Sequence, residues 1–195
     1  LYGAGAFHQT LGDCRMAVDR YDALLAVEPD HEDGALQRLV CLGYLARHED
    51  AIAAATRLID DRFDNMGEAY YWRAWNHHKR ERLSPARADI DRAMSLHVDS
   101  RVLALSGIIK YEQREFDGAA RDLLGAINMD PAQCIARWYL GLVAFEHEDW
   151  PGTGNQFEAS AGCYLASAER SEQDLARMRD ANLDPVFKAS QNDGL

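Results

Sequence analysis

The stretch AYYWRAWNHHK, residues 69–79, gathers two tyrosines, two tryptophans, two histidines and a lysine within eleven positions. Imidazole and ammonium groups can transfer protons or hold carboxylates, whereas indole and phenol rings supply large contact surfaces. The stretch could therefore belong to an active site, a binding surface or a well-filled core. Which of these holds depends on the elements that position the side chains.

Patterns with catalytic or metal-binding spacing are missing from the sequence. Acids stand beside histidine in DHED at His31 and in HEDW at His147, but neither gives the HExxH spacing that aims two imidazoles at one zinc ion. The patterns GxSxG, GxxxxGK[ST] and GxGxxG do not occur either. We therefore predict that the protein is not an enzyme and uses no cofactor or metal.

Composition and charge favour a helical protein that avoids polyanions. Five Pro and fourteen Gly leave the chain rich in helix formers, and 47% hydrophobic residues are enough for a core. A formal charge of -11 argues against sequence-independent binding of nucleic acid, because a basic face is needed to neutralise phosphates. No apolar run approaches the ~20 residues of a membrane helix, so no membrane insertion is predicted.

The four cysteines lie far apart and form no CxxC pair; they are Cys14, Cys41, Cys134 and Cys163. A metal knuckle or a disulfide framework usually shows tighter, paired spacing. We interpret all four as small buried hydrophobic residues. The compartment stays open between cytoplasm, periplasm and secretion, with the cytoplasm favoured.

A pattern of alanine, a bulky residue after four positions and Ala or Leu after seven returns along the chain. Steps of four and three place these residues on one face of a helix. The leading residues are 34, 35, 33 and 34 positions apart. The copies are Ala17, Tyr21 and Leu24; Ala51, Ala55 and Leu58; Ala86, Ile90 and Ala93; Ala119, Leu123 and Ala126; and, more weakly, Thr153, Phe157 and Ser160.

Another apolar, periodic segment precedes each of these helices and carries a small residue that would let two helices approach closely. These residues are Gly5, Val40, Ala74, Gly107 and Gly141. Pro29 and Pro131 end the second helix of copies one and four. Each copy is thus predicted to be a helix hairpin, with a turn one residue short in copy two, LARHEDAI.

The order small residue, Ala, aromatic, Ala, Pro at this period resembles the tetratricopeptide repeat, in WYLGLVAF of copy five and FDGAARDLLGAINMDP of copy four. The resemblance covers residues 1–166. It implies an all-α fold, a right-handed α-α superhelix (solenoid) in which hairpins stack on their neighbours. The five copies span about 1–31, 32–65, 66–99, 100–132 and 133–166. A C-terminal capping helix and tail are expected over 167–195.

In this family the first helix of each hairpin lines a concave groove, which the resemblance carries over to ten residues. They are Tyr44, Tyr71, Trp75, His78, Lys79, Ile108, Tyr111, Trp138, Leu142 and Phe145. Tyr70, Trp72 and Ala74 are instead predicted to pack within the stack. The Lys and Asn of the family's clamp for chaperone tails are replaced by other residues at these slots. An alternative interpretation is that Trp75 and Trp138 only fill space between hairpins.

These observations predict a non-enzymatic module that binds a peptide or protein segment in the groove. Aromatic rings suit such a surface, and the run from His77 to Arg82 adds positive charge that could hold a carboxylate beside Trp75. The partner is not identified. The alternative is a structural segment of a larger protein that self-associates through its N-terminal end, because no polar cap precedes Leu1.

Overall fold

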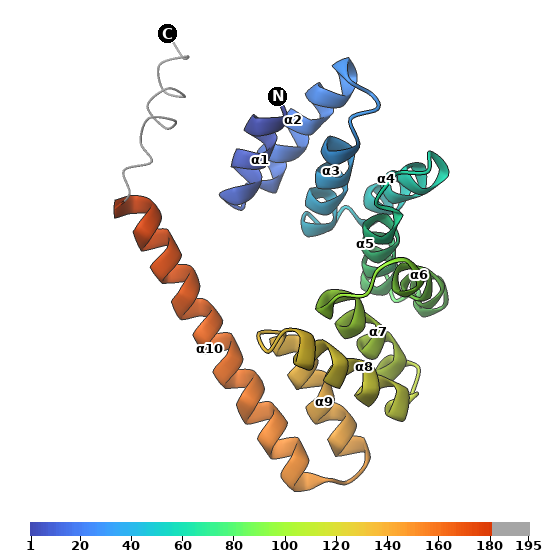
Figure 1. Cartoon of the computed structure of the whole chain (residues 1–195), viewed down its shortest axis with the longest axis vertical. Helices are drawn as coiled ribbons and strands as arrows, with labels where there is room; N and C mark the ends of the chain where they lie inside the picture. The colour runs from blue at the N-terminus through green and yellow to red at the C-terminus, as the bar shows by residue number, and fades with distance from the viewer. Residues whose placement is uncertain (181–195) are drawn as a thin grey trace.

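The computed structural model describes residues 1–180, and over that range the secondary structure is entirely helical (Figure 1). Ten helices follow one another in the described chain. They are α1 (Tyr2–Thr10), α2 (Cys14–Val27), α3 (Glu32–Tyr44), α4 (His48–Asp60), α5 (Met66–Lys79), α6 (Leu83–Leu96), α7 (Ser100–Glu112), α8 (Phe116–Met129), α9 (Cys134–Glu146) and α10 (Trp150–Asp180).

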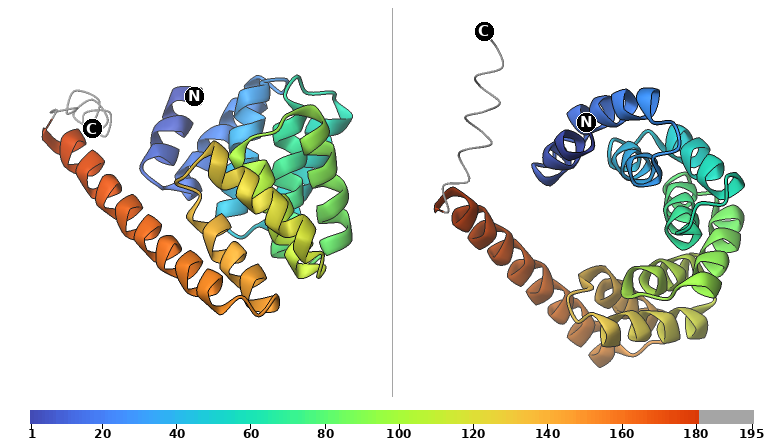
Figure 2. Two further views of the ribbon diagram at one scale, coloured as in Figure 1. Left: turned by 60° about the horizontal axis from the view of Figure 1, so that its bottom comes forward. Right: turned by 45° about the horizontal axis from the view of Figure 1, so that its top comes forward.

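Consecutive helices pair into five hairpins, from α1–α2 to α9–α10, and each hairpin packs against the next. Odd-numbered helices also contact one another from hairpin to hairpin, whereas even-numbered helices of the described chain do not. The odd-numbered helices therefore form the inner, concave side of an arc and the even-numbered helices its outer side (Figure 2). The predicted all-α superhelix of helix hairpins is confirmed.

Glycine lets the two helices of a hairpin approach closely. A Cβ atom added to Gly107 would lie 2.6 Å from Leu123, and one added to Gly141 would lie 2.6 Å from Phe157. Carbon atoms in contact stay about 3.5–4.0 Å apart, so a larger residue would push these helices away from each other. The contact is also dry, since Leu123 is fully buried.

Each hairpin turns through one residue with a left-handed backbone. The φ angles are 76° at Gly12, 58° at Ala46, 58° at Glu81, 65° at Arg114 and 59° at Glu148. In the third hairpin the N–H of Glu81 donates to the carbonyl of His78 at 2.8 Å, and the N–H of Arg82 donates to that of His77 at 2.9 Å. This pair of bonds is a Schellman motif, which satisfies the last carbonyls of the inner helix.

The second hairpin corrects one expectation from the sequence. Its turn, residues 45–47, has three residues, as do the turns of the other four hairpins, so it is not one residue short. Leu39, rather than Val40, therefore occupies the place of Gly5, seven positions before the left-handed residue. The repeat length varies instead in the links between hairpins, 28–31, 61–65, 97–99 and 130–133.

Helix α10 continues far beyond the length of the other helices. It runs without a break from Trp150 to Asp180, so the outer helix of the fifth hairpin and the start of the expected capping segment are one element. Figure 1 shows it crossing the open side of the arc. The expected helix stop and tail, at 182–195, lie outside the described residues. None of the helices in the described range is both long and apolar enough to cross a membrane.

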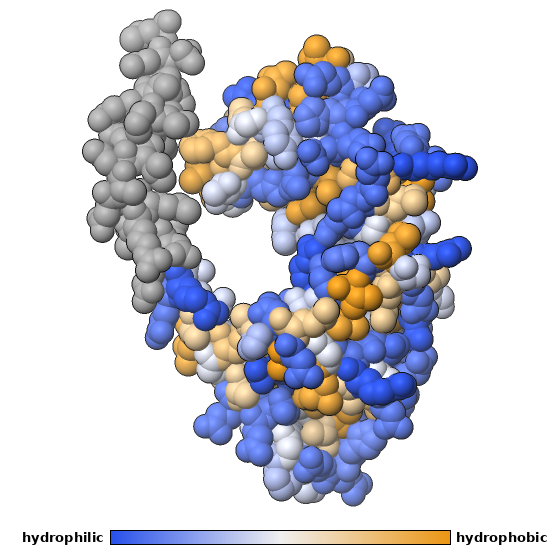
Figure 3. Space-filling view, viewed as in Figure 1, coloured by the Kyte–Doolittle hydropathy of each residue, from blue (hydrophilic) through white to orange (hydrophobic). Residues whose placement is uncertain are grey.

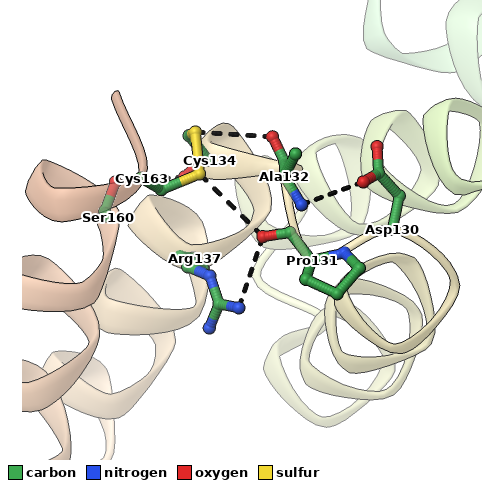
Figure 4. The surroundings of a disulfide bond; sticks show 7 residues. All are labelled: Asp130, Pro131, Ala132, Cys134, Arg137, Ser160 and Cys163. Atoms are coloured by element: carbon green, nitrogen blue, oxygen red, sulfur yellow. Dashed lines mark hydrogen bonds between the residues drawn. A yellow bond between two sulfur atoms is a disulfide. The ribbon is translucent and has the colours of Figure 1, made fainter. Parts of the chain in front are cut away.

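A disulfide corrects the interpretation of the cysteines. Cys134, the first residue of α9, is bonded to Cys163 of α10, with their Cα atoms 5.4 Å apart (Figure 4). The prediction that all four cysteines are free hydrophobic residues is therefore wrong for this pair. The bond closes the fifth hairpin covalently, where Ser160 also donates a hydrogen bond to the carbonyl of Cys134 at 3.0 Å.

The left-handed turn residues generate a test of the turn geometry. Replacing Glu81 by Gly should raise the free energy of unfolding by about 0.5–1 kcal/mol, because only glycine adopts a positive φ without steric cost. The reverse change, Gly12→Ala, should lower it by about 1 kcal/mol, although a Cβ there meets no atom within 4 Å. Urea unfolding of both variants measures the effect. Equal destabilisation by Glu81→Gly and by Ala53→Gly, in the middle of α4, would contradict the assignment.

Candidate functional site

Helix α5 distributes the side chains of residues 69–79 over different environments. Trp72, Ala74 and Asn76 are buried, Tyr71, Trp75 and His78 are partly buried, and Lys79 is exposed. The buried residues hold α5 against its neighbours, since Trp72 belongs to the same core cluster as residues of α3 and α4. The partly buried rings and Lys79 are left at the inner side of the arc.

A hollow of about 190 Å³ lies on the inner side where α5, α7 and α9 meet; we call it the central hollow. Five of the ten predicted groove residues line it, namely Tyr71, Trp75, His78, Lys79 and Ile108. The remaining lining residues are Arg101, Ala104, Leu105, Gln133, Ile135 and Tyr139. Space-filling atoms show that the inner side of the arc faces an open centre (Figure 3).

Sequence reasoning missed several of these lining residues. Ile135 lies three positions before Trp138, so the helical step already followed along α9 would have reached it. Arg101 lies seven positions before Ile108 and Tyr139 lies three positions before Leu142, so the same step along α7 and α9 would have reached them as well.

The other five predicted groove residues lie elsewhere on the inner helices. Tyr44 is 64% exposed and contacts Trp72 and Trp75 edge to face, while Tyr111 packs against Phe116 and Tyr139. Trp138 and Phe145 contact rings of α10, with centroid distances of 4.7 Å to Phe157 and 5.3 Å to Trp150. Leu142 is partly buried. Their role in binding stays a prediction.

Among the residues whose side chains are described, Lys79 is the cation of the central hollow that has no acidic partner. Its Nζ atom lies 5.4 Å from the centre of the Trp75 ring, a cation–π contact. Within residues 1–172, no carboxylate lies within salt-bridge distance of it. Arg80 and Arg82, which follow in the sequence, are both paired with Glu49 at 3.3 and 2.7 Å. The positive run of the sequence is thus reduced to one available charge.

The remaining polar groups of the hollow are neutral or already paired. Arg101 lies over the ring of Tyr71 at 5.1 Å and binds Glu68 and, at 2.6 Å, Asp99. His78 Nε2 is 2.9 Å from a carboxylate oxygen of Glu112. Burial raises the pKa of Tyr71 to about 12, which keeps its phenol neutral. The hollow therefore offers apolar rings with a single ammonium group at its edge.

A buried ion pair fixes α5 to the helices on both of its sides. The Arg73 guanidinium makes two bonds to Asp89 of α6, at 2.8 and 2.7 Å, and its third nitrogen donates to Thr56 of α4 at 3.1 Å. The Asp89 side chain is only 8% exposed. Because both guanidinium edges are occupied, the bonds to α4 and α6 fix the orientation of α5 on the side away from the hollow. They thereby also fix the positions of Tyr71 and Trp75.

A larger cavity, of about 520 Å³, lies between the ends of α2, α3 and α4. Its lining mixes acids and bases with Leu25, Leu58 and Phe63, and it contains none of the predicted groove residues. It lacks the aromatic rings of the inner helices, so we do not consider it the binding site. No three His, Cys, Asp or Glu side chains gather as a metal site in the described part of the chain.

Stacked helix hairpins with a left-handed turn residue every 33 to 35 positions define a tetratricopeptide-repeat fold. Solved structures agree. TTC0263, a thermophilic TPR protein of Thermus thermophilus, is similar with a TM-score of 0.68 and 15% identity, covering 93% of this chain and 95% of its own. PilW, a widely conserved type IV pilus biogenesis factor, is similar with a TM-score of 0.73 and 17% identity, covering 84% of this chain and 76% of its own.

YrrB, a TPR protein with an unusual peptide-binding site, has a TM-score of 0.62 at 14% identity and covers 82% of both chains. No model of a protein family and no curated protein matches the sequence. At these identities the similarity concerns the fold. The resemblance to the tetratricopeptide repeat is therefore confirmed at that level.

The ion pair behind α5 can be tested with two aspartates that differ in burial. Asp89→Ala leaves the Arg73 guanidinium without its partner and should lower the free energy of unfolding by about 3 kcal/mol. Asp91→Ala removes an exposed i,i+4 pair with Arg87 and should cost less than about 1 kcal/mol. Chemical denaturation of both variants gives the comparison. Similar losses for the two would show that Asp89 does not hold α5 in place.

Proposed function

We propose that the protein is a non-enzymatic binding module whose central hollow holds a segment of another protein. The observation that carries the proposal is the hollow itself, in which partly exposed Tyr71 and Trp75 stand beside Lys79, a lysine that meets no carboxylate of residues 1–172. Rings of this kind give large contact area with few rotatable bonds, which is why aromatic residues anchor protein interfaces. The peptide-binding site of YrrB, a protein of similar fold, adds support by analogy.

The chemistry of the hollow indicates which segment fits. Ile108 and Leu105 form an apolar floor, so an aliphatic or aromatic side chain of the ligand would be buried there. Lys79 would then hold a carboxylate, either an acidic side chain or a chain terminus, next to Trp75. Both contacts together favour a peptide with one acid beside one apolar residue.

Peptide selection with charge-reversed variants tests this function. Peptides selected from a random library on the whole chain should bind at least about tenfold more weakly to Lys79→Glu, because a charge-assisted hydrogen bond is worth about 1.5–3 kcal/mol. Ile135→Asp, at the opposite side of the hollow, should weaken binding similarly. The matched control is Tyr164→Ala, an exposed ring of α10 away from the hollow. Ile135 and Tyr164 are 37% and 49% exposed, and Lys79 is exposed as well, so folding should be unaffected by the three substitutions.

Two outcomes would contradict the proposal. One is full affinity in both hollow variants together with loss in Tyr164→Ala, which would move the binding site to α10. The other is a failure to select any peptide whose binding depends on Lys79 or Ile135. Thermal unfolding of each variant, measured in parallel, separates loss of binding from loss of structure.

A second candidate function, self-association, has its own observation. Tyr164 and Leu165 of α10 are 49% and 68% exposed, and Leu1 and Leu11 of the first hairpin are each 58% exposed. Exposed apolar side chains at the two ends of a solenoid are suited to end-to-end stacking.

Sedimentation of the whole chain decides between the two functions. Self-association through α10 predicts a species larger than the monomer that Leu165→Glu returns to the monomer, because a charge cannot be buried in an apolar contact without large cost. A monomeric wild-type chain at high concentration would exclude it. Lys79→Glu serves as the control and should leave the mass unchanged.

A further inference from the structure

Two cysteines remain free in the described chain, and they lie side by side. Cys14 is the first residue of α2 and Cys41 lies within α3, so they belong to different hairpins. Their Sγ atoms are 2.8 Å apart, and their side chains are buried, with 9% and 0% exposure. Carbon atoms in contact stay about 3.5–4.0 Å apart, and sulfur is larger than carbon. A separation of 2.8 Å is therefore too short for two unbonded sulfur atoms at rest.

The pair resembles the disulfide at the other end of the arc. Cys134 is the first residue of α9, and its partner Cys163 lies within the adjacent helix, 29 positions along the chain. Cys14 and Cys41 are 27 positions apart and also join a first helical residue to the interior of the adjacent helix. The bond at 134–163 lies within one hairpin, whereas the pair at 14–41 spans two.

The surroundings do not suit the other uses of paired cysteines. A structural zinc site needs four ligands, and among the described residues no third His, Cys, Asp or Glu joins the two thiols. A redox-active cysteine needs a low pKa and access to solvent. Burial, with the Cys14 thiol beside it, instead raises the pKa of Cys41. The pair lies among apolar side chains of the core cluster that also contains Trp72 and residues of α3 and α4, which is the environment of a structural bond.

We propose that Cys14 and Cys41 form a second disulfide, which joins the first hairpin covalently to the second. Before the two hairpins pack against each other, the Cys14 thiolate attacks a disulfide of a thiol–disulfide oxidoreductase, forms a mixed disulfide and releases one thiolate of the enzyme. Cys41 then attacks the Cys14 sulfur and displaces the second thiolate. The two cysteines lose two electrons and two protons, and the oxidoreductase takes both up as its disulfide becomes a dithiol.

This bond would complete a pattern in which both ends of the solenoid are cross-linked while its centre is not. The end hairpins of a repeat array have a neighbour on one side only and are the first to open. A protein with two such bonds belongs in an oxidising compartment, such as the periplasm or the extracellular space. The proposal thus favours those compartments over the cytoplasm, which the sequence alone slightly favours while leaving the compartment open.

Peptide mapping without reduction tests the bond directly. The whole chain is exported to the bacterial periplasm, denatured with an excess of alkylating reagent and no reductant, digested, and analysed by mass spectrometry. The expected result is a linked pair of peptides that contain Cys14 and Cys41, together with the linked pair from Cys134 and Cys163. Alkylation of both Cys14 and Cys41 in most molecules, whatever the state of the other pair, overturns the proposal.

A second measurement uses stability and does not depend on peptide recovery. In the variant Cys134→Ala, Cys163→Ala, reductant should lower the midpoint of thermal unfolding by roughly 10 °C, as expected for a loop of this length. The variant that also carries Cys14→Ala and Cys41→Ala is the control and should not respond to reductant. An unchanged midpoint in the first variant would show that Cys14 and Cys41 are not bonded.

Discussion

The whole arc depends on one contact, repeated five times, between an inner and an outer helix. Three of the pairs that make it are Gly5 and Tyr21, Gly107 and Leu123, and Gly141 and Phe157. The same positions in the second and third hairpins hold Leu39 and Ala55, and Ala74 and Ile90, and each of these two pairs belongs to one core cluster. In four hairpins the inner residue is small and the outer one bulky; in the second hairpin the sizes are reversed. Because close packing constrains the combined volume more than the identity of either residue, helix spacing and curvature can survive the exchange.

The same aromatic residues that fill the core also orient the candidate binding surface. Trp72, which is 7% exposed, contacts the rings of Tyr44, Tyr71 and Trp75 at centroid distances of 5.6, 5.3 and 5.7 Å. The partly exposed rings are thus held from below by a buried one. A surface built this way loses little side-chain freedom on binding, which lowers the entropic cost of association. Core and groove residues therefore belong to one aromatic cluster, which is why both kinds occur together in residues 69–79.

The sequence predicts the arc well because its signals are local. Steps of three and four residues along one helix reveal both the repeat length and the residues that share a helix face. For that reason five predicted groove residues meet at the central hollow. The rest depends on contacts between helices. Trp138 and Phe145 have groove spacing but meet rings of α10, and the bond between Cys134 and Cys163 joins residues 29 positions apart. The sequence placed Val40 instead of Leu39 at the position of Gly5 in the second hairpin. The error arose because the small residue that marks this position in the other hairpins is replaced there by Leu39.

Charge sets a further condition on any ligand of the hollow. The chain carries a formal charge of -11, so a strongly acidic partner is repelled where its acids come close to the acidic surface. That repulsion is screened beyond about 8 Å at physiological salt, whereas the contact to Lys79 acts at closer distance. A segment held as we propose would therefore carry a single carboxylate where it meets Lys79 and be neutral or basic elsewhere. Selectivity would then come as much from the acidic surface as from the hollow, since the surface rejects segments in which several acids surround the one that binds.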